Sequence, residues 1–146
     1  FLIALYSVYE FAVTVIANKM KEKTKKRISI DDLKGAFTER AKNYYKRTLE
    51  FELYSKNPEW QKIKMLVDLR NAFAHANGRL EIMAKKGEKI EKHAQREKGI
   101  SLNHGYILCD ADVVRSIFDA VNESLEDLIT RYRSWDDQNS HAATHP

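Results

Sequence analysis

The chain has 146 residues, of which 43% are hydrophobic and 32% are charged, with five glycines and two prolines. This length predicts one domain with a modest core, and the scarcity of glycine and proline favours a helical protein over an all-β or a disordered one. The formal net charge of +4 favours a polyanionic partner such as RNA, but only weakly, because many proteins that bind no nucleic acid carry a similar excess.

The cysteine and histidine content indicates no metal site. The single cysteine, Cys109, excludes an intrachain disulfide framework and leaves no thiolate set for structural zinc. Most of the histidines share no metal-ligand spacing with carboxylates or with Cys109: His93, His104, His141 and His145. We therefore expect no metal, no cofactor and a reducing compartment, most simply the cytoplasm.

The first predicted element is a long amphipathic helix. Its apolar residues recur at steps of three and four: Leu2, Leu5, Tyr9, Ala12, Ile16 and Met20. The stretch from 1 to 17 has the apolar character of a signal peptide or membrane span, but polar residues interrupt it and no basic stretch precedes it. We expect no membrane association. Since the chain opens on Phe1 rather than Met, we expect it to be a fragment whose true start is missing.

A mostly basic stretch, residues 21–27, follows; we expect it to be solvated, with contact to RNA as the alternative. Ser29 or Asp31 is expected to cap a second helix, which carries the apolar stripe Leu33, Phe37, Ala41, Tyr44 and Phe51. The Tyr44 ring is a candidate for stacking on an RNA base, although aromatic residues at helical spacing usually belong to a core.

A third helix is predicted to begin at Asn57-Pro58-Glu59 and to end at Asn77-Gly78, where a left-handed residue commonly terminates a helix. Residues 79–99 predict a mobile or partly helical excursion. Residues 100–108 then predict a hairpin, because β-forming residues flank Asn103-His104-Gly105.

Asp110 or Asp112 is expected to start the last helix, and residues 136–146 a disordered polar tail. The predicted fold is therefore all-α: an up-and-down bundle of four to five helices, with a small hairpin before the last helix. It forms one domain over residues 1–135 and dimerises through the third helix.

Three residues of the third helix can do chemistry. An α-helix advances about 100° per residue, so Asn71 and His75 share a face, and a bond from the Asn71 amide would hold the imidazole and its tautomer. Arg70 and His75 point roughly 140° apart, so we expect two copies to combine their side chains in one cleft. Arginine can bind two phosphate oxygens and histidine can transfer protons near neutrality, which suffices to cleave RNA without metal. On spacing alone, the simpler reading is that Arg70 pairs with an acid on another helix and His75 caps the helix end.

The segment Asp68-Leu69-Arg70-Asn71-Ala72-Phe73-Ala74-His75 resembles the R-x4-H signature of the HEPN superfamily, with its polar residue straight after the arginine. The order of long helices, motif, variable loop and closing helix is also similar to that family. Many members are RNases of toxin–antitoxin, abortive-infection and CRISPR systems, and the RiboL-PSP type is the branch that this chain resembles most. Members controlled by AMP transfer carry a tyrosine where this chain has Asn77, so the likeness does not extend to that control.

The resemblance implies that Arg70 and His75 are catalytic, that Asn71 supports them, and that the active site is shared between two protomers. It also implies RNA as substrate and an antitoxin or a defence-system protein as a further partner. Arg79, just past the helix end, is a candidate for a secondary phosphate contact. Two alternatives remain: a non-catalytic module of the same fold that binds RNA or a nucleotide, and a helical subunit whose basic patches meet an acidic protein.

Overall fold

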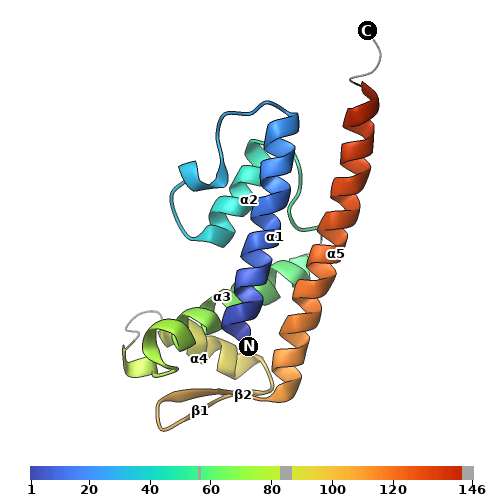
Figure 1. The fold of residues 1–146 in the computed structure, drawn as a ribbon. Coiled ribbons are helices and arrows are strands. Elements are labelled where there is room, and N and C mark those ends of the chain that lie inside the picture. The colour runs from blue at the N-terminus through green and yellow to red at the C-terminus, as the bar shows by residue number, and fades with distance from the viewer. Residues whose placement is uncertain (56, 83–86, 143–146) are drawn as a thin grey trace. The chain divides into compact units, whose positions relative to one another are not determined.

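The computed structural model describes residues 1–55, 57–82 and 87–142. It is mostly helical, with a two-stranded antiparallel hairpin before the last helix, which confirms the predicted fold class. The longer elements, labelled in Figure 1, are α1 (Leu2–Lys23), α2 (Phe37–Arg47), α3 (Asn57–Ala76), α4 (Gly87–Arg96), β1 (Ile100–Asn103), β2 (Tyr106–Cys109) and α5 (Ala111–Ala142). Two short 3-10 helices are η1 (Ile30–Asp32) and η2 (Leu80–Ile82). The bundle arrangement and dimerisation through α3 stay predictions.

The chain divides into two compact units. The first unit contains Phe1–Val8 and Pro58–Asn122, and the second contains Tyr9–Asn57 and Glu123–Pro146. Helices α1 and α5 therefore contribute residues to both units. This division identifies two groups of residues that are each compact, and it does not test whether they form one domain. The single domain predicted for residues 1–135 therefore stays a prediction.

In the first unit, α3 lies where the sequence predicts it. Its buried residues form one broad apolar face: Ile63, Met65, Leu66, Leu69, Ala72 and Ala76. After Ala76 the backbone turns through Asn77 and Gly78, whose φ angles are 48° and 75°, as predicted for a left-handed helix end. A side chain at Gly78 would meet the Phe73 ring at 3.3 Å, so packing as well as backbone conformation favours glycine there.

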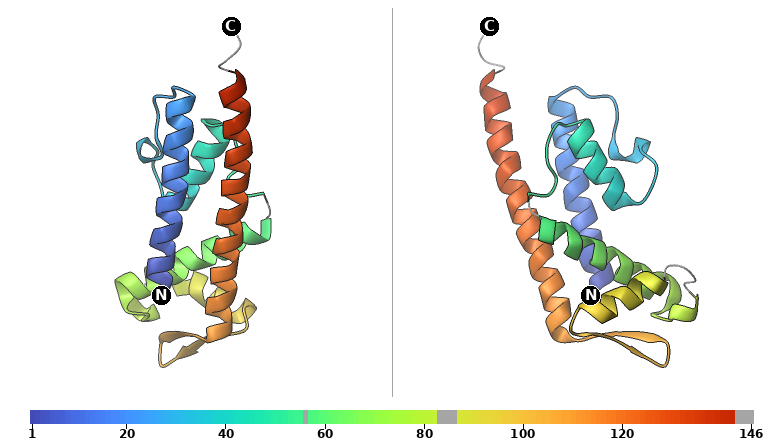
Figure 2. Two further views of the ribbon diagram at one scale, coloured as in Figure 1. Left: turned by 45° about the vertical axis from the view of Figure 1, so that its right-hand side comes forward. Right: turned by 180° about the vertical axis from the view of Figure 1, so that it is seen from behind.

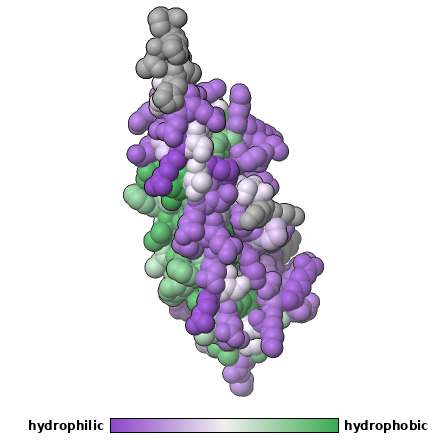
Figure 3. All heavy atoms as spheres, turned by 90° about the vertical axis from the view of Figure 1, so that its right-hand side faces the viewer, coloured by the Kyte–Doolittle hydropathy of each residue, from purple (hydrophilic) through white to green (hydrophobic). Residues whose placement is uncertain are grey.

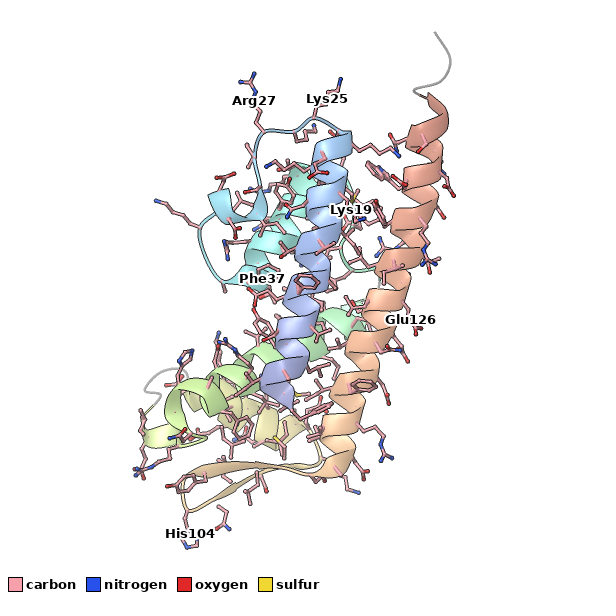
Figure 4. The ribbon with its side chains drawn as sticks, viewed as in Figure 1. Lys19, Lys25, Arg27, Phe37, His104 and Glu126 are labelled. Carbon is pink, nitrogen blue, oxygen red and sulfur yellow. The ribbon has the colours of Figure 1, made fainter. Side chains whose placement is uncertain are left out.

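The hairpin of the first unit also confirms its prediction. Asn103 pairs with Tyr106, which leaves His104 and Gly105 as a two-residue turn with φ angles of 49° and 79°. Positive φ at both positions matches the right-handed twist of the flanking strands. Figure 4 shows the His104 side chain pointing away from this turn.

Helices η2 and α4 account for the helical part of the predicted excursion, and residues 83–86 lie outside the described part of the chain. Helix α4 packs against β1 (Figure 2) and buries Ile90 completely. His93 lies about one helical turn after Ile90, and its side chain contacts Asp68 of α3. The His93 side chain is therefore mostly buried, although most of the surrounding residues of α4 are exposed.

In the second unit, the predicted second helix is interrupted. Ser29 caps only the 3-10 helix η1, through a reciprocal contact with Asp32, and α2 begins separately at Phe37. Gly35 lies between them with φ 110°, a conformation that ends any helix and that residues with a side chain rarely adopt. Phe51 also falls outside α2, since the chain leaves the helix at Thr48. Lys25 and Arg27 project from the loop after α1, as Figure 4 shows.

Helix α1 is long and apolar enough to cross a membrane by length and composition, a property shared by core helices of soluble proteins and by N-terminal signal sequences. Tyr9, Val13, Ala17 and Met20 are completely buried, in the spacing that the sequence predicts for one face. The absence of membrane association and the cytoplasmic location stay predictions.

Helix α5 begins where predicted, because the Asp110 carboxylate accepts a hydrogen bond from the Val113 amide at 2.9 Å. Its hydrophilic side chains run along the face seen in Figure 3. The helix continues to Ala142, so the disordered tail predicted from residue 136 is wrong for residues 136–142. Lys23 explains part of this extension, since it contacts Asp136 at 2.6 Å and Ser140 at 2.5 Å. Residues 143–146 lie outside the described part.

Candidate active site

Arg70 is half-buried on α3 and is held on two sides by residues of the first unit. One terminal nitrogen donates a hydrogen bond to the Asn71 side-chain oxygen at 2.9 Å, and the guanidinium lies 5.2 Å from the centre of the Tyr6 ring. Its Nε is buried and has no hydrogen-bond partner among the described residues. No ion pair joins Arg70 to an acid in the described part of the chain, so the predicted pairing with an acid on another helix is not found there.

Asn71 is the partner of Arg70 rather than of His75. Among the hydrogen bonds of the described residues, none joins the Asn71 amide to the imidazole. The preceding arginine is long enough to bend round the helix and engage the amide oxygen first. On a regular helix the Arg70 and His75 side chains point roughly 140° apart, and Asn71 lies between these two directions. The bond to Asn71 therefore directs the guanidinium toward the side of α3 that carries His75.

His75 is exposed in the last turn of α3. No hydrogen bond, ion pair or ring contact joins its side chain to another described residue. Its ring is therefore accessible to a substrate. Asp68, Asn71 and His75 follow one another at spacings of three and four, which places all three along a single face of the helix.

Arg79, the predicted secondary phosphate contact, is exposed just past α3. Its guanidinium lies 5.7 Å from the centre of the Tyr106 ring, and one of its nitrogens is 3.7 Å from a Glu81 carboxylate oxygen. The structure thus gives it neighbours within the first unit while leaving about half of its side chain accessible.

Tyr44 lies in the second unit and does not fit the predicted role in base stacking. Only 1% of its surface is exposed, and its hydroxyl donates a hydrogen bond to the Ile28 carbonyl at 2.7 Å. Burial raises the pKa of this hydroxyl, so it stays protonated as a donor. Its ring offers no free face, and we leave it out of the candidate site.

A histidine–carboxylate pair that the sequence did not predict lies beside the motif. The His93 Nε2 of α4 lies 3.0 Å from an Asp68 carboxylate oxygen of α3, and both side chains are mostly buried. A second pair, at 2.9 Å, joins Lys62 of α3 to Glu97, the residue that follows α4. Lys62, His93 and Glu97 line a pocket of about 420 Å³ beside α3 and α4. The spacing of His93 three residues after the buried Ile90 was the one signal for its inward position.

The part of the chain that the structure describes contains no group of three or more metal-ligating side chains. Cys109 is half-buried, and burial together with the nearby Asp110 carboxylate raises the pKa of its thiol, which disfavours the thiolate that nucleophiles and metal ligands need. The expectation of a site without metal or cofactor stays a prediction.

Comparison of the chain with protein-family models, with curated proteins and with solved structures finds no match. The resemblance to the HEPN superfamily stays a prediction from the motif and from the order of the elements around it.

Proposed function

We propose that this chain is a metal-independent endoribonuclease of the HEPN type, acting as a toxin or as an antiviral, abortive-infection effector. The observation that carries the proposal is the state of Arg70: a half-buried guanidinium, oriented by Asn71 and Tyr6, with no acid partner in the described chain and with a buried Nε left without a hydrogen bond. Five residues further along the same helix, His75 is exposed.

A guanidinium in this state favours an anionic ligand. A buried donor without a partner costs free energy, and a phosphate oxygen placed against Nε and a terminal nitrogen would satisfy it. An arginine that merely stabilised the fold would instead be expected to pair with a carboxylate. Phosphate binding by Arg70 is therefore the simplest use of the arrangement.

In the proposed reaction, His75 removes the proton of the ribose 2′-hydroxyl while Arg70 binds the phosphate. The 2′-oxygen attacks phosphorus, and the bond from phosphorus to the 5′-oxygen breaks. A protonated histidine donates a proton to that leaving oxygen, so the products are a 2′,3′-cyclic phosphate and a 5′-hydroxyl. Two histidines serve these two steps most simply if a second copy of the chain contributes its own His75.

One observation favours the alternative, a non-catalytic module that binds RNA or a nucleotide. Because Asn71 is engaged by Arg70, no neighbour among the described residues fixes the His75 ring. A catalytic histidine is usually oriented by a second group. Under the ribonuclease proposal, His75 would therefore gain such a contact only when RNA or a second copy of the chain is bound.

The test is incubation of the purified protein with total RNA in EDTA, beside Arg70→Ala and His75→Ala. Arg115→Ala and His104→Asn serve as matched controls, because they remove an exposed arginine and an exposed histidine outside the site. We expect cleavage by the wild type and by both controls, with 5′-hydroxyl ends on the products, and none by the two site variants. Cleavage that persists in both site variants would refute the assignment.

A wild type that cuts nothing, but binds RNA as tightly as His75→Ala does, would favour the binding module. Sedimentation tests the second copy independently: a strict monomer that still cuts RNA contradicts the shared site and leaves the ribonuclease assignment intact.

A further inference from the structure

The hairpin is tied directly to the end of the motif helix. The Ile107 amide donates a hydrogen bond to the Gly78 carbonyl at 2.9 Å, and an isolated bridge pairs Arg79 with Tyr106. All of these residues belong to the first unit. Tyr106 is therefore held beside the backbone that leaves α3 immediately after His75.

Tyr106 is an exposed aromatic ring with a cation beside it. It has 44% of its surface exposed, although strand neighbour Ile107 is buried at 3%. The Arg79 guanidinium lies 5.7 Å from the ring centre. No hydrogen bond joins the Tyr106 hydroxyl to another described residue. A tyrosine that served only to pack the hairpin would be expected to bury more of its ring.

The acid beside Arg79 is replaceable. Glu81 lies 3.7 Å away, at the long end of the range for an ion pair, and 76% of its side chain is exposed. Such pairs are weakened by solvent and contribute little. A phosphate group, which accepts two parallel hydrogen bonds from a guanidinium, can therefore displace Glu81.

We propose that Tyr106 and Arg79 bind one nucleotide next to the cleaved bond, with its base stacked on the Tyr106 ring and its phosphate on the Arg79 guanidinium. The inference rests on the proposed function for its substrate, single-stranded RNA. Stacking on an aromatic ring tolerates every base, because every base has a π-face, so this contact positions the strand and gives little sequence preference. Tyr106 thus acts as a substrate-positioning residue for His75.

The test measures binding without cleavage, in the His75→Ala variant of the whole 146-residue chain. The probe is a 12-nucleotide single-stranded RNA carrying one 2-aminopurine, whose fluorescence is quenched when the base stacks. We expect Tyr106→Ala to weaken binding roughly 5- to 100-fold and to abolish the protein-dependent quenching, as loss of one stacking residue does. Tyr106→Trp should restore both, because it keeps an aromatic face.

Leu108→Ala is the matched control, since Leu108 lies on the same strand and is exposed to a similar degree, 48%. It should leave binding unchanged. Glu81→Gln should tighten binding, and Arg79→Ala should reduce the slope of log affinity against log salt by about one. A purely structural role for Tyr106 does not predict the tighter binding of Glu81→Gln. If Tyr106→Ala binds like Leu108→Ala, the inference is wrong.

The two proposals fail separately. If the wild type cuts RNA and Tyr106→Ala changes neither affinity nor KM, the stacking site is refuted while the ribonuclease stands. If the wild type cuts nothing but binding and quenching depend on Tyr106, the ribonuclease is refuted while the stacking site stands.

Discussion

The charged side chains of α3 up to Asp68 and those from Arg70 onward are used in different ways. In the first part, Lys62 pairs with Glu97, the residue after α4, and Asp68 pairs with His93 of α4. In the second part, neither Arg70 nor His75 is paired with an acid in the described part of the chain. The first part therefore uses charge to bind a neighbouring segment, and the second keeps its charge available for a ligand.

An arginine of the second unit sharpens this contrast. The Nε of Arg40 is also buried without a hydrogen bond, but its terminal nitrogen contacts the Asp31 carboxylate and the Ile30 carbonyl. An unmade bond on one guanidinium nitrogen is thus not in itself a sign of a site. Arg70 differs from Arg40 because its Nε lacks a hydrogen bond and its guanidinium also lacks an acid partner among the described residues. Folding alone gives no reason to keep an arginine in this state.

The largest expected difference between the paired and the unpaired side chains lies in catalysis. We expect His75→Ala to lower the rate of RNA cleavage about 100- to 10,000-fold, the usual contribution of an acid–base group. His93→Ala should leave the rate per folded molecule unchanged, because its ring is bound to Asp68. Single-turnover cleavage in EDTA measures both. If the two variants lose the same activity, the comparison fails.

For the free energy of unfolding, we expect the opposite order, with a larger effect of His93→Ala than of His75→Ala. His93→Ala leaves the Asp68 carboxylate without its partner, so we expect the free energy of unfolding to fall by about 1 to 2 kcal/mol. His75→Ala removes an exposed side chain and should change it by less than about 0.5 kcal/mol. Urea denaturation followed by circular dichroism measures both variants. Equal losses would mean that His75 has a structural role that its exposure hides.

Asn71→Ala tests the bond that orients the guanidinium. Loss of one hydrogen bond to Arg70, worth about 1 kcal/mol, should slow cleavage roughly fivefold and lower the free energy of unfolding by no more than about 1 kcal/mol. Asn71→Asp is the informative companion, because its carboxylate would pair with Arg70 and compete with phosphate. It should be slower than Asn71→Ala; a faster Asn71→Asp would show that the arginine does not bind the substrate.

The smallest effect is expected for the Lys62–Glu97 pair. A double-mutant cycle with Lys62→Met and Glu97→Gln should give a coupling of about 0.2 to 1 kcal/mol in the free energy of unfolding, which is typical of partly exposed pairs. The coupling should fall at high salt. A coupling above this range would mean that the pair is less accessible to solvent than its exposed fractions indicate.

The sequence predicts elements whose signals are local. The start and end of α3 and the hairpin follow from Asn, Pro and Gly at fixed offsets, and Asp110 caps α5 as its type suggests. The errors arise where longer contacts decide. Lys23 binds Asp136 across 113 positions, so composition alone could not predict that residues 136–142 are helical. Gly35 interrupts the second helix although the apolar stripe continues through it.

The candidate site shows the same division. The spacing of four residues places Asn71 and His75 on one face of α3. The Asn71 amide nevertheless bonds Arg70, its neighbour in the sequence, because the arginine side chain is long enough to reach it. The inward position of His93 follows only from the docking of α4, because most residues around it in the sequence are polar or charged and exposed: Glu91, Lys92, Gln95 and Arg96. The exposed ring of Tyr106 beside Arg79 likewise depends on the hairpin folding back on the end of α3.

The contact between Tyr6 and Arg70 joins positions 64 residues apart. A segment moved to another protein must therefore include both positions to keep this contact. A designer who grafted residues 70–75 onto another helix would carry over the reactive groups without the ring against which the guanidinium rests. The same holds for shortened versions of this chain: one that lacks the first turns of α1 should keep the motif and yet let the arginine swing free.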